Sequence, residues 1–335
     1  MPSEESDCRL SIRQNIEENS LPTVSYMVMN VLATVVACYG LLADSTAVVI
    51  GAMIIATLLG PITGVSLGLV EGNNQLLRKA LLTEIAGVLI VLTVAAIVGK
   101  IHQDTPIGKE IFSRTAPNIL DLLIALAGGA AGAYATVSPK LSVGLVGVAI
   151  STALVPPLAA SSILLVRGGT KLAMGAFLLF FTNFVSIQVA ASVVLWLNGY
   201  QKIVNPDQGF KKLLLRNGVS FGILITLIVL LGLNFQKSLE KQKFENKVRA
   251  QLIAELSDIP STFLADLRFN PESEKMVITA VIRTPGTITP SYVAILESKL
   301  PHPADKSVEL NISSVFTRVI NKDGYLYNEP GQSDE

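Results

Sequence analysis

The chain has few charged residues and few of the residue types that bind metals or form cross-links. Only 16% of its 335 residues are charged, whereas about 25% is usual for soluble proteins. Its two cysteines, Cys8 and Cys38, form neither a disulfide framework nor a CxxC metal clip. No P-loop glycine pattern occurs, and no nucleophile can be paired with a base. We therefore expect no metal, no cofactor and no enzymatic activity.

Charge is unevenly distributed along the chain. Residues 21–235 carry 12 basic and 7 acidic side chains, whereas residues 236–335 carry 12 basic and 14 acidic ones. Neither part has the clustered Lys and Arg of a nucleic-acid-binding surface, so we expect no nucleic-acid partner. The amphipathic segment 1–22 is acidic, whereas a signal peptide begins with positive charge. The first apolar run is therefore expected to be a retained membrane anchor.

Long apolar runs fill the part of the chain before residue 236. About 20 helical residues cross the roughly 30 Å hydrocarbon core of a bilayer. Runs of this length lie at 23–42, 46–70, 79–99, 118–137, 143–166, 172–198 and 213–235. They predict an α-helical integral membrane protein with a transmembrane domain at 23–235, whose partner is the lipid bilayer. Tyr26 and other aromatic residues near the run ends are typical of the membrane interface.

Two of these runs are interrupted by proline. Gly60-Pro61 lies in the middle of run 46–70, and Pro156-Pro157 lies in run 143–166. A proline removes a backbone donor and disturbs the preceding turn. In lipid, the freed carbonyl groups must be satisfied by protein or by water in a cavity. Each break is therefore a candidate binding site.

The two interrupted runs are related by a shift of 96 residues. The shift aligns, without a gap, Gly51, Ile54, Leu58, Pro61, Ser66, Leu69, Val70, Gly72, Leu76 and Ala80 with Gly147, Ile150, Leu154, Pro157, Ser162, Leu165, Val166, Gly168, Leu172 and Ala176. We interpret 19–99 and 115–198 as two copies of one unit, followed by a final span. If the interrupted runs cross the membrane, there are seven spans and the copies are inverted. If they are re-entrant, there are five spans and the copies are parallel.

The last 100 residues are predicted to be soluble. A connecting helix, two strands, a short helix and a third strand are expected at 236–258, 263–269, 276–283, from Pro290, and at 307–320. This α-β-β-α-β order over 259–325 resembles ferredoxin-like regulatory modules, an analogy that does not fix function. Residues 326–335 are expected to be a disordered tail. Basic residues after the last span favour a cytoplasmic position for this domain.

Several long strings resemble a known family. They are residues 41–53 (Leu-Leu-Ala-Asp-Ser-Thr-Ala-Val-Val-Ile-Gly-Ala-Met), 60–62, 114–126 (Arg-Thr-Ala-Pro-Asn-Ile-Leu-Asp-Leu-Leu-Ile-Ala-Leu), 146–150 and 153–158. The chain is similar to a hydrophobic family of bacterial and archaeal membrane proteins, number 389 among the domains of unknown function. The family usually has a further proline where this chain has Thr57. The resemblance implies the inner membrane of a prokaryote and leaves the activity open.

Polar residues near the run ends are candidate site residues. Asp44 and Lys140 are equivalent under the shift, and Asp44 also fits the N-cap of the helix after it. Arg114, Asn118 and Asp121 have spacings that place them on one helical face. An ionisable residue within a span is a functional candidate because its insertion costs about 2.5 to 3.5 kcal/mol. An interfacial pair of Asp121 with Arg114 is the structural alternative.

Two further sets of residues have both a functional and a packing interpretation. Glu84 lies deeper in its span without an evident partner, and Asn183 either joins helices or lines a polar path. Glycines recur every four residues at Gly60, Gly64, Gly68 and Gly72, and again at Gly128 and Gly132. Such small residues allow helices to pack closely. They favour close packing within the chain or in a homo-oligomer.

These observations favour a transporter or channel-like protein, because duplicated breaks have little use in a simple anchor. The expected path residues are Asp44, Thr57, Gly60, Pro61, Arg114, Asn118, Asp121, Pro156, Pro157 and Asn183. The C-terminal domain is expected to regulate the membrane part by binding a small molecule, whose class the sequence leaves open, nucleotides included. The alternative is a membrane-anchored ligand sensor or oligomeric scaffold without transport.

Overall fold

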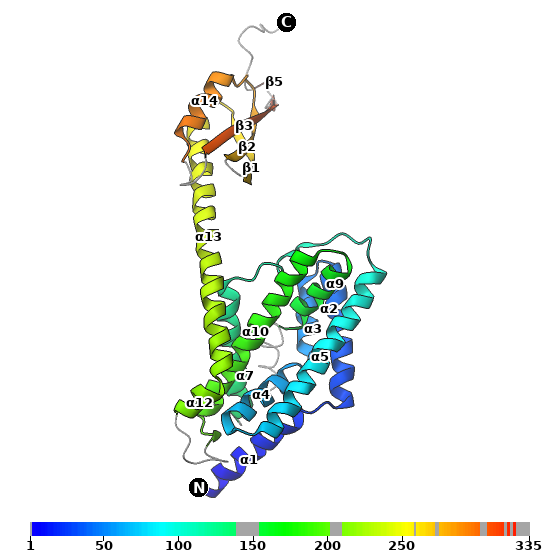
Figure 1. Ribbon diagram of the computed structural model, residues 1–335. Helices are drawn as coiled ribbons and strands as arrows, with labels where there is room; N and C mark the ends of the chain where they lie inside the picture. The colour runs from blue at the N-terminus through cyan, green and yellow to red at the C-terminus, as the bar shows by residue number, and fades with distance from the viewer. Residues whose placement is uncertain are drawn as a thin grey trace. The chain divides into compact units, whose positions relative to one another are not determined.

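The computed structural model in Figure 1 divides into two compact units, Met1–Phe235 and Gln236–Glu335. It describes residues 2–138, 154–201, 210–257, 259–271, 275–301, 307–317, 320–321 and 324–325. Lys140, most of the first half of the second interrupted run, and the tail 326–335 lie outside the described residues. The predictions for these positions therefore stay predictions.

The first unit is helical. Its described helices are α1 (Pro2–Asn19), α2 (Val24–Leu42), α3 (Thr46–Ile55), α4 (Leu59–Glu71), α5 (Asn74–Ile101), α6 (Lys109–Phe112), α7 (Ile119–Val137), α9 (Val155–Val166), α10 (Thr170–Leu197), α12 (Phe210–Arg216) and α13 (Gly218–Leu256), whose last part belongs to the second unit. Polar caps set several boundaries. Thr23 accepts a hydrogen bond from Tyr26 N before α2, and Asn73 accepts two before α5. Gly72 ends α4 with φ of 72°, a left-handed conformation that favours glycine.

Several of these helices suit a bilayer. Helices α2, α5, α7 and α10 are long and apolar enough to cross a membrane, and α3 with α4 would be a fifth span if the bent pair crosses. Leu82, Leu89 and Ile97 lie along one face of α5 and are 56–57% exposed, as expected for contact with lipid. The chain is therefore mostly helical and compatible with an integral membrane protein. The shorter apolar helices are α9 and the first part of α13.

The core of the first unit lies where the interrupted runs meet the long helices. Helix α4 packs against both α5 and α10, and α9 packs against the same two helices (Figure 1). Leu58, Ile62, Leu158 and Ile163 are fully buried in this core. The two proline-containing helices are thus central elements of the unit.

The second unit has a small mixed sheet. Its elements after α13 are β1 (Phe263–Pro271), β2 (Lys275–Thr284), α14 (Pro290–Lys299), β3 (Ser307–Phe316), β4 (Ile320–Asn321) and β5 (Gly324–Tyr325). Strands β1 and β2 are antiparallel, and β2 and β3 are parallel. Val248, Leu252, Ile278, Leu296 and Leu310 form its core, which joins the end of α13 and α14 to the sheet. The predicted order of elements is confirmed.

Candidate functional site

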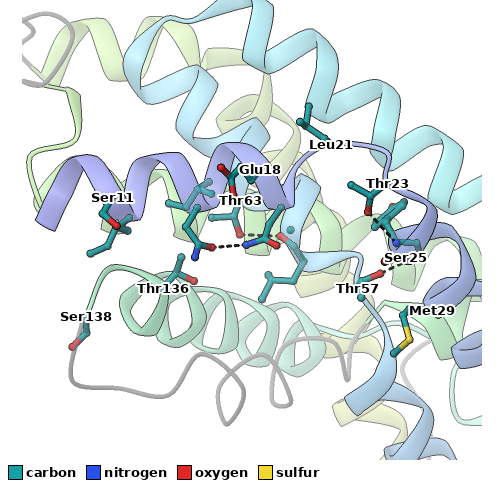
Figure 2. Close-up of a pocket in the computed structure, with 17 residues that line it drawn as sticks. Ser11, Glu18, Leu21, Thr23, Ser25, Met29, Thr57, Thr63, Thr136 and Ser138 are labelled. Carbon is teal, nitrogen blue, oxygen red and sulfur yellow. Dashed lines mark hydrogen bonds between the residues drawn. The ribbon is translucent and has the colours of Figure 1, made fainter. Parts of the chain in front are cut away.

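A pocket of about 720 Å³ lies at the junction of α3 and α4 (Figure 2). Its walls come from α1, the start of α2, this junction and the end of α7. The lining residues are Ser11, Ile12, Asn15, Ile16, Glu18, Asn19, Leu21, Thr23, Ser25, Tyr26, Met29, Thr57, Leu59, Gly60, Thr63, Thr136 and Ser138. The first proline break therefore opens onto a cavity.

The pocket has a mixed apolar and polar lining and carries little charge. Hydroxyl and amide groups line it from four separate segments, such as Ser11, Asn15, Thr57 and Thr136. Glu18 is the one charged side chain among the described lining residues. Neutral hydroxyls and amides bind solutes by hydrogen bonds, and a single carboxylate favours a cation over an anion. The lining therefore suits a small polar solute that is neutral or positively charged.

The junction leaves backbone groups free to face the pocket. Helix α3 ends at Ile55, Ala56 is extended with ψ of 140°, and α4 follows with a bend of 52° between the two helices. The Thr57 N–H and hydroxyl donate only long hydrogen bonds of 3.5 Å, to Asn30 Oδ1 and to Tyr26 O. Such long bonds are weak. The backbone at the break is therefore only loosely satisfied by neighbouring groups.

The N-terminal helix α1 is held over this junction by buried contacts. Arg13 donates to both carboxylate oxygens of Glu71 at 2.7 and 2.9 Å, and the Glu71 side chain is fully buried. This hydrogen bonding raises the pKa of the Arg13 guanidinium. Ser20, at the end of α1, donates to Gly60 O at 3.3 Å. Helix α1 is thus a structural wall of the pocket.

The glycine ridge of α4 explains how α1 comes so close. A Cβ atom on Gly60 would overlap the carbonyl of Asn19, and one on Gly64 would overlap Ser20. One on Gly68 would lie 2.9 Å from Leu77 N. The ridge therefore packs against α1 and α5 of the same chain. Gly132 is buried, whereas a Cβ on Gly128 would meet nothing within 4 Å.

Asp44 does not cap α3, which corrects the N-cap prediction. Its φ is 52°, and its Oδ1 accepts a hydrogen bond from Glu110 N at 2.6 Å, at the start of α6. Ser45 is the N-cap residue of α3 and makes no side-chain cap bond. The left-handed conformation turns the Asp44 carboxylate away from α3 toward α6. Asp44 lies outside the pocket lining.

Arg114, Asn118 and Asp121 do not share a helical face, because α7 begins only at Ile119. Asn118 is its N-cap and forms a capping box with Asp121, in which each side chain bonds the other's backbone N–H. Arg114 pairs with Glu110 at 2.9 Å. The expected Arg114–Asp121 pair is therefore replaced by two local interactions, both outside the pocket lining.

The other predicted site residues are distributed over the core. Pro156 and Pro157 lie in the first turn of the buried helix α9, where a missing N–H leaves no bond unmade. Asn183 is buried on α10. Only Thr57 and Gly60 of the predicted path residues line the pocket, and Pro61 follows directly. The sequence prediction therefore found the junction and missed the other walls of the pocket.

Tyr26, predicted to be an interfacial residue, is instead 5% exposed and reaches from the pocket to α5. Its hydroxyl donates to Thr83 O at 3.2 Å. Next to Thr83, Glu84 is 3% exposed, and neither carboxylate oxygen has a hydrogen-bond partner among the described residues. The sequence signal for the wall formed by α1 is its polar stripe at Ser11, Asn15 and Glu18, which has helical spacing.

Comparisons with known proteins give a family model and a relative of this chain. The family model described as "Domain of unknown function (DUF389)" matches residues 53–189. An uncharacterised protein of Methanocaldococcus jannaschii is 33% identical over 210 residues, which are 62% of this chain and 63% of that protein. The matched part thus covers less than two thirds of that relative's length. No solved structure matches the chain.

Proposed function

Because residues 53–189 belong to the DUF389 family, as the sequence strings predicted, we propose that this membrane protein is a transporter or channel-like protein. Its solute path runs through the junction of α3 and α4. The observation that carries this proposal is the pocket of about 720 Å³ at that junction, into which hydroxyl and amide groups project among apolar side chains. A cavity with such groups beside a bent apolar helix pair suits solute passage, because non-helical backbone at membrane depth is tolerated where it lines a cavity.

The direction of the neighbouring helices supports a crossing by α3 and α4. Helices α2 and α5 run the same way, because Tyr26, near the start of α2, contacts Thr83 in the first half of α5. Tyr39 contacts His102 at their ends, with ring centroids 5.4 Å apart. The chain must therefore return along the full length of α5 between the end of α2 and Asn74. We infer that the bent pair is a broken span.

Helix directions also support two inverted copies. Adding 96 to the residue numbers that bound α5 gives the bounds of α10. The bounds of α4 and α9 correspond in the same way to within one residue. Helix α4 runs opposite to α5, since Gly64 and Gly68 pack against Ala80 and Leu77. Helix α9 runs along α5, since Ser162 bonds Leu92 O and Ile163 packs against Gly99. Corresponding helices that point in opposite directions are expected of inverted repeats.

The remaining parts of the proposal rest on composition. We place the protein in a prokaryotic inner membrane with a cytoplasmic C-terminal domain, because basic residues follow the last apolar run. The C-terminal domain binds a small-molecule regulator, for which its separate core provides a scaffold. A homo-oligomer would use the open face of α7 at Gly128.

The transport proposal is tested by solute efflux from proteoliposomes. The panel contains small neutral polar solutes and small organic cations. We expect Thr57→Leu to lower efflux at least tenfold, because it fills the pocket with an apolar side chain. Thr93→Leu is the matched control, since Thr93 is exposed on α5 outside the pocket lining. No flux of any solute under any gradient would overturn the proposal, and ligand binding without flux would favour a sensor.

The two prolines offer a second comparison. Pro61→Ala lies next to the pocket-lining Gly60, in the first turn of α4, and removes the ring that disfavours a continuous helix from α3 into α4. We expect it to change flux more than it changes the amount of folded protein, as measured by efflux and by chromatography. Pro157→Ala is the corresponding change in α9. Unchanged flux in both variants would show that the prolines are simple kinks.

A further inference from the structure

A buried acid lies beside the pocket without a partner. Glu84 is near the middle of α5, about 5 Å from the helix midpoint at 1.5 Å per residue. Its side chain is 3% exposed, and among the described residues neither of its carboxylate oxygens accepts a hydrogen bond. An ionised carboxylate in this position is costly. A buried acid of this kind needs a proton or another cation when the site is closed.

The surroundings of Glu84 contain one other titratable group. Of the helices that pack against α5, α2 contributes Tyr26, which interacts electrostatically with Glu84. Cys38 lies about three turns further along α2. On α4, Glu71 is paired with Arg13, and α9 carries no titratable side chain. Within the described part of the chain, no cation therefore neutralises Glu84.

The groups near Glu84 suit a proton better than a metal ion. Metal ions such as Na⁺ need several oxygen ligands, and no group of three or more His, Cys, Asp or Glu residues gathers in the described residues. The side-chain oxygen of Asn30, one turn from Tyr26 on α2, already accepts a hydrogen bond from Thr57 N at 3.5 Å. A carboxyl group with few oxygen ligands around it binds a proton.

Tyr26 connects this acid to the pocket. Its side chain lines the cavity, and its hydroxyl is bonded to the carbonyl group of the residue before Glu84. A Cβ on Gly87, one turn further along α5, would overlap that hydroxyl, so glycine makes room for the ring. The acid and the solute site are thus separated by one aromatic side chain.

We propose that Glu84 is a proton-binding site that exchanges its proton with the pocket past Tyr26 as solute binds and leaves. The Glu84 O–H bond breaks as its proton passes to a water molecule of the pocket, which becomes hydronium, and the reverse transfer re-forms the carboxyl O–H bond and the neutral water. The coupling role rests on the proposed transport function, whereas the proton site itself does not. The equivalent position under the 96-residue shift is Phe180, so this site has no counterpart on α10.

The proton site is tested without any solute, by infrared pH titration of the full chain in nanodiscs. We expect a protonated carboxyl band near neutral pH that disappears on alkalinisation and is absent in Glu84→Gln. Glu18→Gln is the control, since Glu18 is an exposed acid of the pocket. The same spectrum in wild type and Glu84→Gln would overturn the proposal. A band that responds to Na⁺ at constant pH, and not to pH, would do so as well.

The coupling is tested in proteoliposomes with a proton gradient and the solute panel. Glu84→Gln should lose gradient-driven uptake at least tenfold and retain downhill exchange, and Tyr26→Phe should slow the gradient-driven step. Downhill exchange shows that the variant is folded. Wild-type gradient dependence in Glu84→Gln would overturn the coupling role. A titrating Glu84 band in a protein without any flux would instead contradict the transport proposal alone.

Discussion

The helices of Val24–Ile101 and of Ile119–Leu197 follow one plan but surround their middle with different chemistry. Around the first, Tyr26, Asn30 and Glu84 are buried polar residues near the junction. The positions 96 residues later are Leu122, Leu126 and Phe180, all apolar. Packing is therefore shared by the two segments, whereas this polar group belongs to one. Under the proposed inverted arrangement of the two segments, a single polar site gives the protein a defined direction.

The ends of α4 and α9 differ in charge. Glu71, the last residue of α4, pairs with Arg13 of α1. The equivalent residue after α9 is Arg167, which donates to the backbone carbonyl groups of His102 and Thr105. In both segments, the charged side chain at this helix end contacts residues that come before the segment in the sequence: α1 in the first case and the residues after α5 in the second. Only the first of these contacts closes a pocket.

Loss of the α1 ion pair should have the largest effect. Arg13→Ala removes two charged hydrogen bonds to the fully buried Glu71 carboxylate, each of which contributes about 1.5–3 kcal/mol to stability. We expect α1 to detach, which would speed thiol labelling at an introduced Ser11→Cys. Arg167→Ala should cost less, because it removes hydrogen bonds to neutral carbonyl groups and leaves no buried carboxylate. Equal losses of stability in the two variants would contradict the difference between the segments.

Replacing one glycine of α4 by the residue at the equivalent position of α9 should have the next largest effect. Gly68 corresponds to Leu164, but a Cβ at Gly68 would lie 2.9 and 3.0 Å from backbone atoms of Leu77. We expect Gly68→Leu to destabilise the protein by about 1–3 kcal/mol or more, measured by thermal unfolding in detergent.

Gly128→Leu is the matched control for this change, since it meets no atom within 4 Å of its Cβ. It should fold normally, and by mass measurement it should dissociate a homo-oligomer that uses this face of α7. Wild-type stability in Gly68→Leu would show that α4 and α5 can separate at little cost. A monomeric wild type in several detergents would contradict the oligomer.

A smaller and equal effect is expected from two serines. Ser66 shares its hydroxyl hydrogen between Ile62 O at 2.9 Å and Gln188 O at 3.0 Å, and Ser162 donates to Leu92 O at 2.6 Å. The 96-residue shift takes Ser66 to Ser162 and Leu92 to Gln188, so the two bonds join equivalent positions in the reverse order. Ser66→Ala and Ser162→Ala should each lower the free energy of unfolding by about 0.5–1.5 kcal/mol. Thr93→Ala, which loses a bond within its own helix, is the control, and a loss confined to one serine would contradict the reciprocal arrangement.

Hydropathy and caps predicted the elements of the fold well. Apolar runs locate the long helices because a span needs about 20 apolar residues, and the hydropathy averaged over that length is insensitive to single residues. Strand alternation and turn residues similarly located β1, β2 and β3. Asp44 shows the limit, because a positive φ at a non-glycine residue follows from its tertiary contact with α6. Arg114 shows the same limit, because its spacing from Asn118 and Asp121 places the three residues on one face only if all of them lie in one helix.

Of the residues that line the pocket, only Thr57 and Gly60 were predicted as site residues, because they lie at the interruption of run 46–70 that is visible in the sequence. The acidic stretch that forms α1 reads as a solvent-exposed helix, and its place over the junction depends on Arg13 finding Glu71, 58 residues away. The position of Tyr26 near the end of an apolar run predicted an interfacial aromatic residue. That position does not show which residues its side chain contacts. Partners distant in sequence are set by packing, which composition does not encode.

The reciprocal serine bonds have a consequence for how the two similar segments tolerate substitution. Each serine contacts a main-chain carbonyl group, at a glutamine in one case and a leucine in the other. A carbonyl acceptor is present whatever side chain a residue carries. Helices α5 and α10 can therefore differ in side chain at these acceptor positions without losing the contact. The difference between Glu84 and Phe180, which are equivalent under the 96-residue shift, is compatible with the same pair of contacts.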